Sequence, residues 1–181
     1  MPTPRLSKHF PNSIYFSTLT VIEWIDIFTK HVYFDILIDS LKYCQKKKAL
    51  LLHGYVIMTN HIHLLFSVGE ESAADVFMRD FKKWTTNAIM KELQNESRRY
   101  IKNLLDNTIF KKRQNHFQVW QANNFSEIVE SKQFFMQKLE YIHSNPVRKG
   151  YVDSVEDWKH SSARNWMYED HSVIEVVLTE I

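Results

Sequence analysis

Four segments of the chain are rich in the β-branched and aromatic residues that strands prefer, and three others repeat apolar residues at helical spacing. The strand pattern covers residues 13–22, 50–58, 61–68 and 125–129. The helical pattern covers residues 31–48, 72–93 and 130–145. We predict that Pro146 stops the last helix, because proline disfavours the helical conformation in the residue before it.

The order of these elements is strand, helix, strand, strand, helix, strand, followed by a further helix. This β-α-β-β-α-β order is that of a ferredoxin-like antiparallel sheet, which RNA-recognition modules (RRM-like folds) also have. We therefore predict an α+β fold whose C-terminal helix carries Tyr141. Because unrelated proteins share this topology, the fold decides nothing about activity.

The length of the chain fits one domain. A protein of 181 residues buries roughly 70% of its unfolded surface and needs no disulfide or structural metal to fold. We expect a single domain over residues 1–181, with a core at about 13–166 and a tail at 167–181. The last ten residues, 172–181, are rich in valine and isoleucine. The sequence leaves open whether they add an edge strand, pack over the core or mediate self-association.

Composition and charge narrow the class of protein. Cys44 is the single cysteine, which excludes an intramolecular disulfide and a cysteine-rich zinc site and suits a reducing cytoplasm. The net charge of +2 is too small to indicate a nucleic-acid partner by itself. Residues 95–116, however, hold six Lys/Arg against two acidic residues, and we interpret them as a basic, partly helical insertion.

One charge-free run has the length of a membrane span. Residues 49–69 contain no Asp, Glu, Lys or Arg. The middle of the run carries Thr59, Asn60, His61 and His63, which are costly to bury in lipid. Two adjacent buried strands explain the run better, so we expect no membrane partner.

The first candidate for chemistry is His61-Ile62-His63, inside the third predicted strand. Because side chains alternate along a strand, His61 and His63 point to one face and Ile62 to the other. Two imidazoles one strand repeat apart can bind a single divalent ion. The plainer interpretation is a pair of ordinary histidines on a polar face of the sheet.

The second candidate lies on the last predicted helix. Tyr141 and Asn145 are four residues apart and share a helix face. A tyrosine hydroxyl can attack phosphorus when a cation polarises the phosphate, and an amide oxygen one turn away can complete a two-histidine metal site. Alternatively, Tyr141 is a core or surface aromatic and Asn145 a helix-terminal residue before proline.

Three parts of the chain carry recognisable motifs. Residues 55–65 read YVIMTNHIHLL, residues 141–150 read YIHSNPVRKG, and Trp158 is followed by Ser161 and Ser162. These segments resemble the MPNHVHLL segment, the YIHLNPV+xG segment and the aromatic-x-x-Ser-Ser tail of the single-tyrosine HUH transposases, and more closely those of the branch of REP-associated tyrosine transposases. The resemblance covers roughly residues 13–166.

The resemblance implies a chemistry and a set of roles. His61 and His63 would bind Mg²⁺ or Mn²⁺, Asn145 would be the third ligand, and Tyr141 would be the nucleophile. The implied activity is that of a transposase or strand transferase, which cleaves and rejoins single-stranded or hairpin DNA through a 5′-phosphotyrosine intermediate. The tyrosine acts within its own chain in some members and in the partner chain in others, so a homodimer stays open. Thr59 departs from the proline that usually precedes the asparagine.

Basic and aromatic residues outside these motifs are candidates for DNA contacts. The candidates for phosphate are Lys82, Lys83, Arg98, Arg99, Lys111, Lys112, Arg113, Arg148 and Lys149. The candidates for stacking on bases are Trp84, Phe117 and Trp120. The alternative is that the lysines lie on a solvated helix face and the tryptophans in the core.

Three functions are compatible with these motifs. The first is the metal-dependent tyrosine transposase. The second is a catalytically inactive DNA-hairpin-binding protein on the same fold. The third is a metal phosphoesterase with water as the nucleophile, which would keep its activity in Tyr141→Phe and lose it in His61→Ala. We favour the first, because every ligand and nucleophile position holds a chemically competent side chain.

Overall fold

The structure is a computed structural model, and it describes residues 13–70, 72–95, 118–122 and 125–178. Its sheet is formed by the strands β1 (Ile14–Thr20), β2 (Leu50–Ile57), β3 (His61–Val68) and β4 (Phe125–Val129). The strands lie in the order β2-β3-β1-β4, and each neighbouring pair is antiparallel. The predicted α+β fold with a ferredoxin-like sheet is confirmed, since the two β-α-β halves interleave through β1 and β3.

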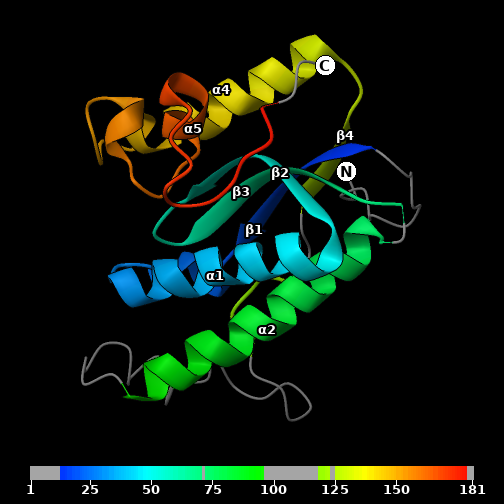
Figure 1. The fold of residues 1–181 in the computed structure, drawn as a ribbon. Helices are drawn as coiled ribbons and strands as arrows, with labels where there is room; N and C mark the ends of the chain where they lie inside the picture. Colours follow the sequence, from blue (N-terminus) through cyan, green and yellow to red (C-terminus); the bar gives the residue numbers. More distant parts are fainter. Residues whose placement is uncertain (1–12, 71, 96–117, 123–124, 179–181) are drawn as a thin grey trace.

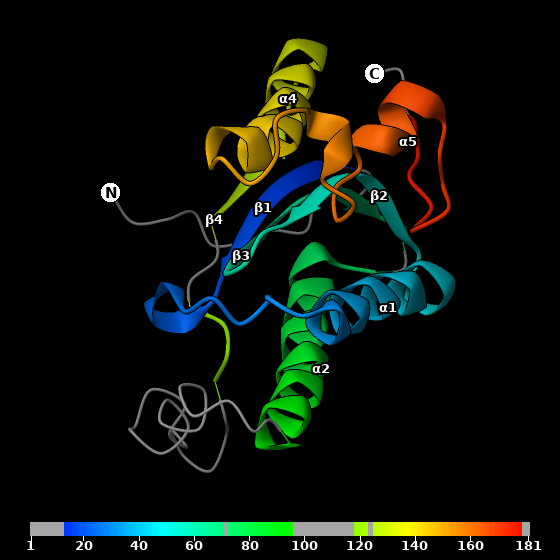
Figure 2. The same cartoon turned by 90° about the vertical axis from the view of Figure 1, so that its left-hand side faces the viewer.

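Helices cover both faces of this sheet (Figure 1). The helices α1 (His31–Lys48) and α2 (Ala74–Asn95) lie on one face, and α4 (Lys132–Arg148) and α5 (Ala163–Tyr168) lie on the other, as the turned view also shows (Figure 2). Two short 3₁₀ turns, η1 (Ile22–Trp24) and η2 (Val155–Asp157), complete the described elements. No helix in the described ranges combines the length and apolar character that a membrane crossing requires.

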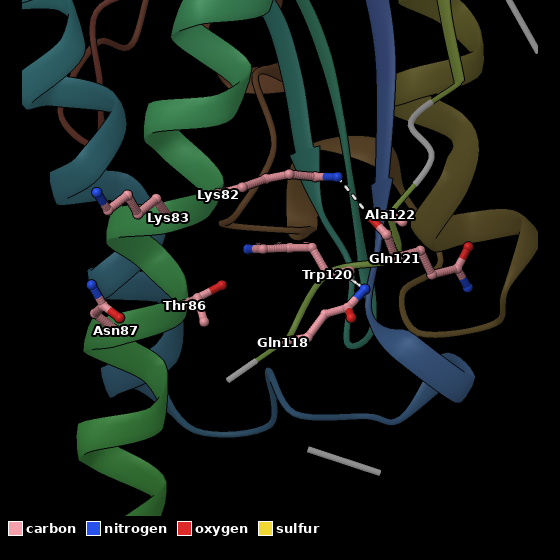
Figure 3. A pocket seen from close by; sticks show the side chains of 8 residues that line it. All are labelled: Lys82, Lys83, Thr86, Asn87, Gln118, Trp120, Gln121 and Ala122. Atoms are coloured by element: carbon pink, nitrogen blue, oxygen red, sulfur yellow. Dashed lines mark hydrogen bonds between the residues drawn. The ribbon is translucent and has the colours of Figure 1, made fainter. Parts of the chain in front are cut away.

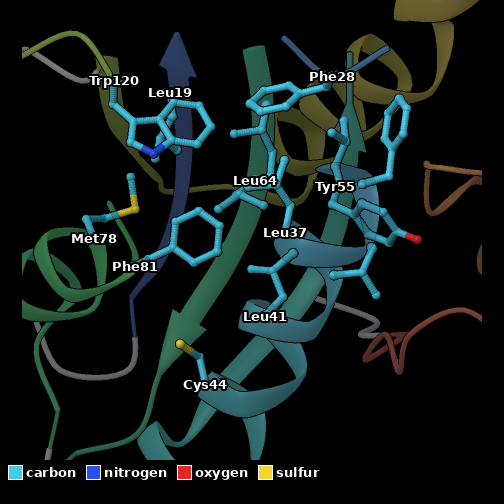
Figure 4. Close-up of a cluster of buried hydrophobic side chains, with 14 of the residues drawn as sticks. Leu19, Phe28, Leu37, Leu41, Cys44, Tyr55, Leu64, Met78, Phe81 and Trp120 are labelled. Carbon is cyan, nitrogen blue, oxygen red and sulfur yellow. The ribbon is translucent and has the colours of Figure 1, made fainter. Parts of the chain in front are cut away.

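The larger core lies between the sheet and the first pair of helices. Figure 4 shows apolar side chains of α1, α2 and the strands meeting there. On β3, Ile62, Leu64 and Phe66 enter this core, as strand alternation requires. The intervening residues of β3 face α4, where a smaller cluster gathers Phe16, Val56, Met58, Leu65, Phe135, Leu139 and Ile142. The helix α4 is therefore held against the sheet by its own apolar contacts.

The prediction that Pro146 stops the helix is wrong. Although Pro146 has no N–H to donate, α4 continues through it to Arg148. Asn145 and Pro146 are both buried, and this packing holds the residue before proline in the helix. The helix ends where Gly150 adopts a φ of +70°, which glycine does without strain.

The segment after α4 returns to the free edge of β2. The Ile57 N–H donates to the His160 carbonyl at 2.8 Å, and the Ser162 N–H donates to the Tyr55 carbonyl at 2.9 Å. The Trp158 indole N–H donates to the Ile57 carbonyl at 3.0 Å. The tail packs over the core, because Ile174 and Val176 are buried and the Val177 N–H donates to the Leu52 carbonyl. These contacts cover an edge that otherwise exposes unpaired backbone groups.

Gly54 allows α4 to lie close to the sheet. A Cβ atom at this position would meet Leu139 Cδ1 at 2.8 Å and Ser162 Oγ at 3.5 Å. We expect Gly54→Val to lower the free energy of unfolding by about 1–3 kcal/mol through overpacking. Leu139→Ala alone should cost about 2–5 kcal/mol because it leaves a cavity. The double variant should lose less than the sum in urea unfolding, since each change accommodates the other. Additive losses would contradict the proposed contact.

Candidate active site

Two strand residues and two helix residues meet between β3 and α4. His61 and His63 point from β3 toward α4, with ring centroids 4.8 Å apart. The Asn145 amide Nδ2–H₂ donates to His63 Nε2 at 3.2 Å. The Tyr141 ring, one turn earlier on α4, lies 5.1 Å from the His63 ring. The structure thus brings together all four residues that the sequence motifs singled out, within one chain.

A carboxylate fixes the orientation of the His61 ring through Asn60. The Asp26 Oδ1 atom accepts from Asn60 Nδ2 at 2.9 Å, and a carboxylate has no proton to donate. The Asn60 amide oxygen therefore faces His61 Nδ1, 2.7 Å away, and accepts the proton carried by that nitrogen. The lone pair of His61 Nε2 is left available, which is the form of imidazole that binds a metal ion.

The His63 ring is oriented by a neighbour on β1. Its Nε2 atom accepts from Asn145, so its proton is on Nδ1, which lies 2.8 Å from Thr18 Oγ1 and donates to it. Thr18 is the residue opposite His63 in the β1–β3 register. Both rings thus carry an unprotonated Nε2 atom, and that of His63 contacts Asn145.

Burial keeps both imidazoles neutral. Desolvation, helped by the positive charge of Lys149 and opposed by Asp26, lowers the pKa of His61 to about 4. Desolvation is the largest cause that lowers the pKa of His63 to about 3, and electrostatic interactions with His61 and Lys138 lower it further. At neutral pH neither ring carries a proton that a metal ion would have to displace from Nε2.

The donor set fits a hard or borderline divalent ion with few protein ligands. The Asn145 amide contacts the His63 ring, and the His61 ring lies beside that of His63. A half-turn of the amide group presents its oxygen in place of its nitrogen. In the described ranges, no three His, Cys, Asp or Glu side chains gather as a metal-binding group, so the candidate set depends on the amide. Such a sparse set leaves coordination positions for water or phosphate oxygens.

Tyr141 lies at the open side of this group. Tyr141 is 37% exposed, whereas His63 is only 4% exposed. The edge of Phe16 packs on its ring at a centroid distance of 6.1 Å, and the Arg148 guanidinium lies 5.5 Å from the ring centre. The ring is thus held in a defined place while part of the side chain faces solvent.

Lys138 adds a fixed positive charge one turn before Tyr141. Its ammonium pairs with Glu127 at 2.7 Å and lies 4.4 Å from the centre of the Phe16 ring. The side chain is only 18% exposed. Because Glu127 pairs with it, the charge of Lys138 is largely balanced, and the ion pair fixes the ammonium beside Phe16 on the face of α4 that carries Tyr141.

The predicted DNA-contact residues divide into two groups. Arg148 and Lys149 end α4 and are exposed beside the four residues described above. Lys82 and Lys83 instead line a pocket of about 610 Å³ between α2 and residues 118–122, where the Lys82 ammonium donates to the Gln121 carbonyl at 2.7 Å (Figure 3). Lys82 therefore makes an internal hydrogen bond as well as facing the pocket.

The two tryptophans proposed to stack on bases differ in exposure. Trp84 on α2 is 52% exposed, but Trp120 is 3% exposed and its indole N–H donates to Thr85 Oγ1. A base cannot stack on Trp120 in this conformation, so the expected stacking role is wrong for that residue. The remaining candidates lie outside the described residues: Arg98, Arg99, Lys111, Lys112, Arg113 and Phe117, together with nearly all of the predicted insertion 95–116.

Thr18, Asp26 and Lys138 were not found from the sequence. Thr18 and Lys138 approach His63 from other elements, and Asp26 reaches His61 through Asn60. Strand register and the course of the loop after η1 decide these contacts, and neither leaves a local pattern. A helical projection of α4 is the one signal available, because it places Lys138 on the face of Tyr141 and Asn145.

Comparisons with known proteins identify the family of this chain. A family model described as Transposase IS200 like matches residues 18–111, slightly more than half of the chain. The match includes His61 and His63 and ends before Tyr141. A protein of Haemophilus influenzae named as a REP-associated tyrosine transposase is 27% identical over 106 residues, which are 59% of this chain and 54% of that protein. The chain thus spans about half the length of this curated relative.

One solved structure extends the likeness to the whole fold. The structure of a REP-associated tyrosine transposase bound to a REP hairpin matches with a TM-score of 0.69 and 16% identity, covering 100% of this chain and 95% of that one. A structure from Deinococcus radiodurans matches 78% of this chain and 95% of that one, with 15% identity and a TM-score of 0.47. The first likeness supports the fold, and the family match confirms the predicted family. The chain belongs to the IS200-like transposase family.

Proposed function

We propose that this protein cleaves and rejoins single-stranded DNA through a covalent bond between Tyr141 and the 5′ phosphate of the broken strand. The observation that carries the proposal is the approach of an exposed tyrosine to a buried, neutral histidine pair, with ring centroids of Tyr141 and His63 5.1 Å apart. Membership in a transposase family supports a reaction on DNA.

Each residue has a separate task in the proposed reaction. His61, His63 and Asn145 would hold Mg²⁺ or Mn²⁺, and the bound ion would neutralise charge on the scissile phosphate. Asn60 and Thr18 orient the two rings so that both Nε2 atoms stay available. Arg148, beside the Tyr141 ring, would supply positive charge near the phosphate without taking part in the bond changes.

The bond changes then need one protein nucleophile. The Tyr141 oxygen attacks phosphorus and loses its proton to solvent, to which the residue is exposed. A new O–P bond forms as the bond from phosphorus to the 3′ oxygen breaks, and the 3′ oxygen takes up a proton. A 3′ hydroxyl, from the same strand or another, reverses these changes and frees Tyr141. No nucleotide cofactor is needed, because the phosphotyrosine keeps the bond energy.

The proposed substrate is a single strand displayed by a hairpin. The structural relative named above was solved with a REP hairpin, and the exposed cations Arg148 and Lys149 end the helix that carries Tyr141. Contact between Tyr141 and His63 of the same chain supports cleavage within one protomer, while a homodimer stays a prediction. We also propose a cytoplasmic location, in keeping with the buried free thiol of Cys44.

The proposed function is tested by trapping the covalent intermediate. The protein is incubated with labelled hairpin-bearing single-stranded DNA and Mn²⁺, and the products are separated on a denaturing gel. We expect a labelled band at the mass of protein plus DNA that is absent when EDTA replaces Mn²⁺. A gel that contains no such band under any divalent ion, although the hairpin binds, favours the catalytically inactive DNA-hairpin-binding protein.

Removing the Asp26 carboxylate should weaken metal binding without touching a ligand. In Asp26→Asn the side chain can present either a donor or an acceptor to Asn60, so the Asn60 oxygen is no longer held toward His61. We expect Mn²⁺ affinity to fall by roughly 10- to 100-fold. Isothermal titration with Mn²⁺ alone measures this loss. Asp39→Asn, on the exposed side of α1, is the matched control, and an equal loss there would contradict the assigned role.

A further inference from the structure

An exposed tryptophan lies next to the candidate active site. Trp24 ends η1 and is 59% exposed, the largest value among the exposed large apolar residues of the described chain. Its ring approaches the His61 ring at a centroid distance of 5.9 Å and an angle of 70°. It thus lies on the His61 side of the histidine pair, whereas Tyr141 lies on the His63 side.

The backbone that presents Trp24 is strained. Glu23 has a φ of 52° and Trp24 a φ of 55°, so two successive residues with side chains adopt the left-handed conformation. The other described non-glycine residues with positive φ, Ala49 and Glu169, follow helix ends, where one such residue is common. Left-handed backbone costs roughly 1–2 kcal/mol for a residue with a Cβ atom.

The surroundings hold this strained turn in place. The Trp24 N–H donates to the Val21 carbonyl at 3.1 Å, and its carbonyl accepts from Asn60 Nδ2 at 3.2 Å. Ile25, directly after it, is buried. The same Asn60 amide orients His61, so the position of Trp24 is tied to that of the histidine pair. Strain of this kind is typical of functional sites, where the fold maintains an unfavourable local conformation.

We propose that Trp24 is the stacking platform for one unpaired nucleobase next to the phosphodiester that Tyr141 attacks. The inference rests on the proposed function, and it adds where the single strand lies beyond the histidine pair. Every base presents a π face, and an exposed indole is a favourable partner for it. Lys149 is exposed at the end of α4 and is available to a phosphate of the strand.

The acidic neighbours of Trp24 do not oppose a base at this position. Asp26 is engaged by Thr59 and by Asn60, and its charge is directed toward those donors. Glu23 is exposed, so solvent screens its charge. A stacked base is uncharged and contacts the indole with its flat face, while the phosphates of the strand remain on the side of the basic residues that end α4. The contact is therefore compatible with the local charges.

Trp24→Gly separates stacking from stability. Glycine adopts the φ of 55° without strain, so the variant should melt at or above the wild-type temperature. It should nevertheless bind a hairpin with a single-stranded extension roughly 5- to 100-fold more weakly. This loss of affinity corresponds to the binding free energy of one base–aromatic stack. Fluorescence anisotropy of a labelled hairpin oligonucleotide measures the affinity. Tyr43→Ala, an equally exposed aromatic on α1, is the control and should bind like wild type.

An abasic walk identifies the stacked base. Each nucleotide of the extension is replaced in turn by an abasic unit, and each strand is titrated with wild type and Trp24→Gly. One abasic position should weaken binding to wild type as much as Trp24→Gly does, and the variant should be insensitive to that position alone. The proposal would be overturned if the loss of affinity caused by the abasic unit added to that caused by Trp24→Gly at every position. Unchanged binding by Trp24→Gly would overturn it as well. Because binding is measured without cleavage, these outcomes are independent of whether the covalent intermediate forms.

Discussion

The Tyr141→Phe protein is expected to form no covalent adduct with DNA while it binds a hairpin like the wild type. The substitution removes one oxygen atom and keeps the ring that contacts His63 and Phe16. The Tyr141 hydroxyl makes no hydrogen bond within the described part of the chain, so folding should not depend on it. The reaction, in contrast, loses its only proposed nucleophile. We expect the yield of adduct to fall by at least about 10³-fold.

The measurement compares adduct, strand breakage and binding on the same hairpin. Adduct is read on a denaturing gel with Mn²⁺, and affinity is read by anisotropy. Tyr168→Phe is the matched control, because Tyr168 is 57% exposed on α5 and has no proposed part in the chemistry. It should give the wild-type amount of adduct. A wild-type amount in Tyr141→Phe would show that another residue is the nucleophile.

The same variant separates the two enzymatic alternatives. A phosphoesterase that uses water would continue to break the strand in Tyr141→Phe and would give no adduct even in the wild type. A strand transferase loses both products together, because breakage and the phosphotyrosine arise in one step. The variant therefore shows whether tyrosine or water is the nucleophile, in addition to testing the role of Tyr141.

Periodicity explains why the core of the candidate site could be predicted from the sequence. Strand alternation placed His61 and His63 on one face of β3, and helical spacing placed Tyr141 and Asn145 on one side of α4. The order of the elements then implied a ferredoxin-like sheet. Such a sheet has two faces, and α4 covers the one that His61 and His63 share. Their roles remain predictions, whereas their proximity is a property of the fold.

Long-range contacts explain what the sequence could not provide. Thr18 meets His63 because β1 and β3 pair in one register, and a shift by one residue would turn Thr18 to the other face. Asp26 reaches Asn60 through a loop whose left-handed turn has no sequence signature. At Pro146 a local rule predicted a helix end, but the buried positions of Asn145 and Pro146 outweighed it. Tertiary packing decided all of these features.

Replacing His61 or His63 by asparagine is the second change with a large expected effect. Asparagine carries an amide near the position of Nδ1 and has no atom at Nε2. The new amide can still donate to Asn60 at position 61 or to Thr18 at position 63. Each variant therefore keeps the contact that orients the ring and loses the atom proposed to bind the metal. We expect Mn²⁺ affinity and adduct yield each to fall by more than about 100-fold, beyond the effect of a residue that only orients a ligand.

Binding of Mn²⁺ is measured without DNA by electron paramagnetic resonance of the free ion, and adduct yield is measured on the denaturing gel. His31→Asn is the control, since His31 is exposed at the start of α1. It should leave both quantities unchanged. Full adduct formation by His63→Asn, or by the wild type in EDTA, would contradict a metal site at this pair.

Stability distinguishes metal binding from a structural role of these histidines. His63 Nε2 accepts from the buried Asn145 amide, so His63→Asn leaves that donor unpaired and should lower the free energy of unfolding by about 1–3 kcal/mol. His61 Nε2 has no hydrogen bond among the described residues, so His61→Asn should unfold in urea almost like the wild type. If the pair binds the ion, both variants lose Mn²⁺ to the same extent although only one is destabilised. If the histidines serve only the fold, loss of Mn²⁺ and adduct should instead follow the loss of stability, and His61→Asn should keep both.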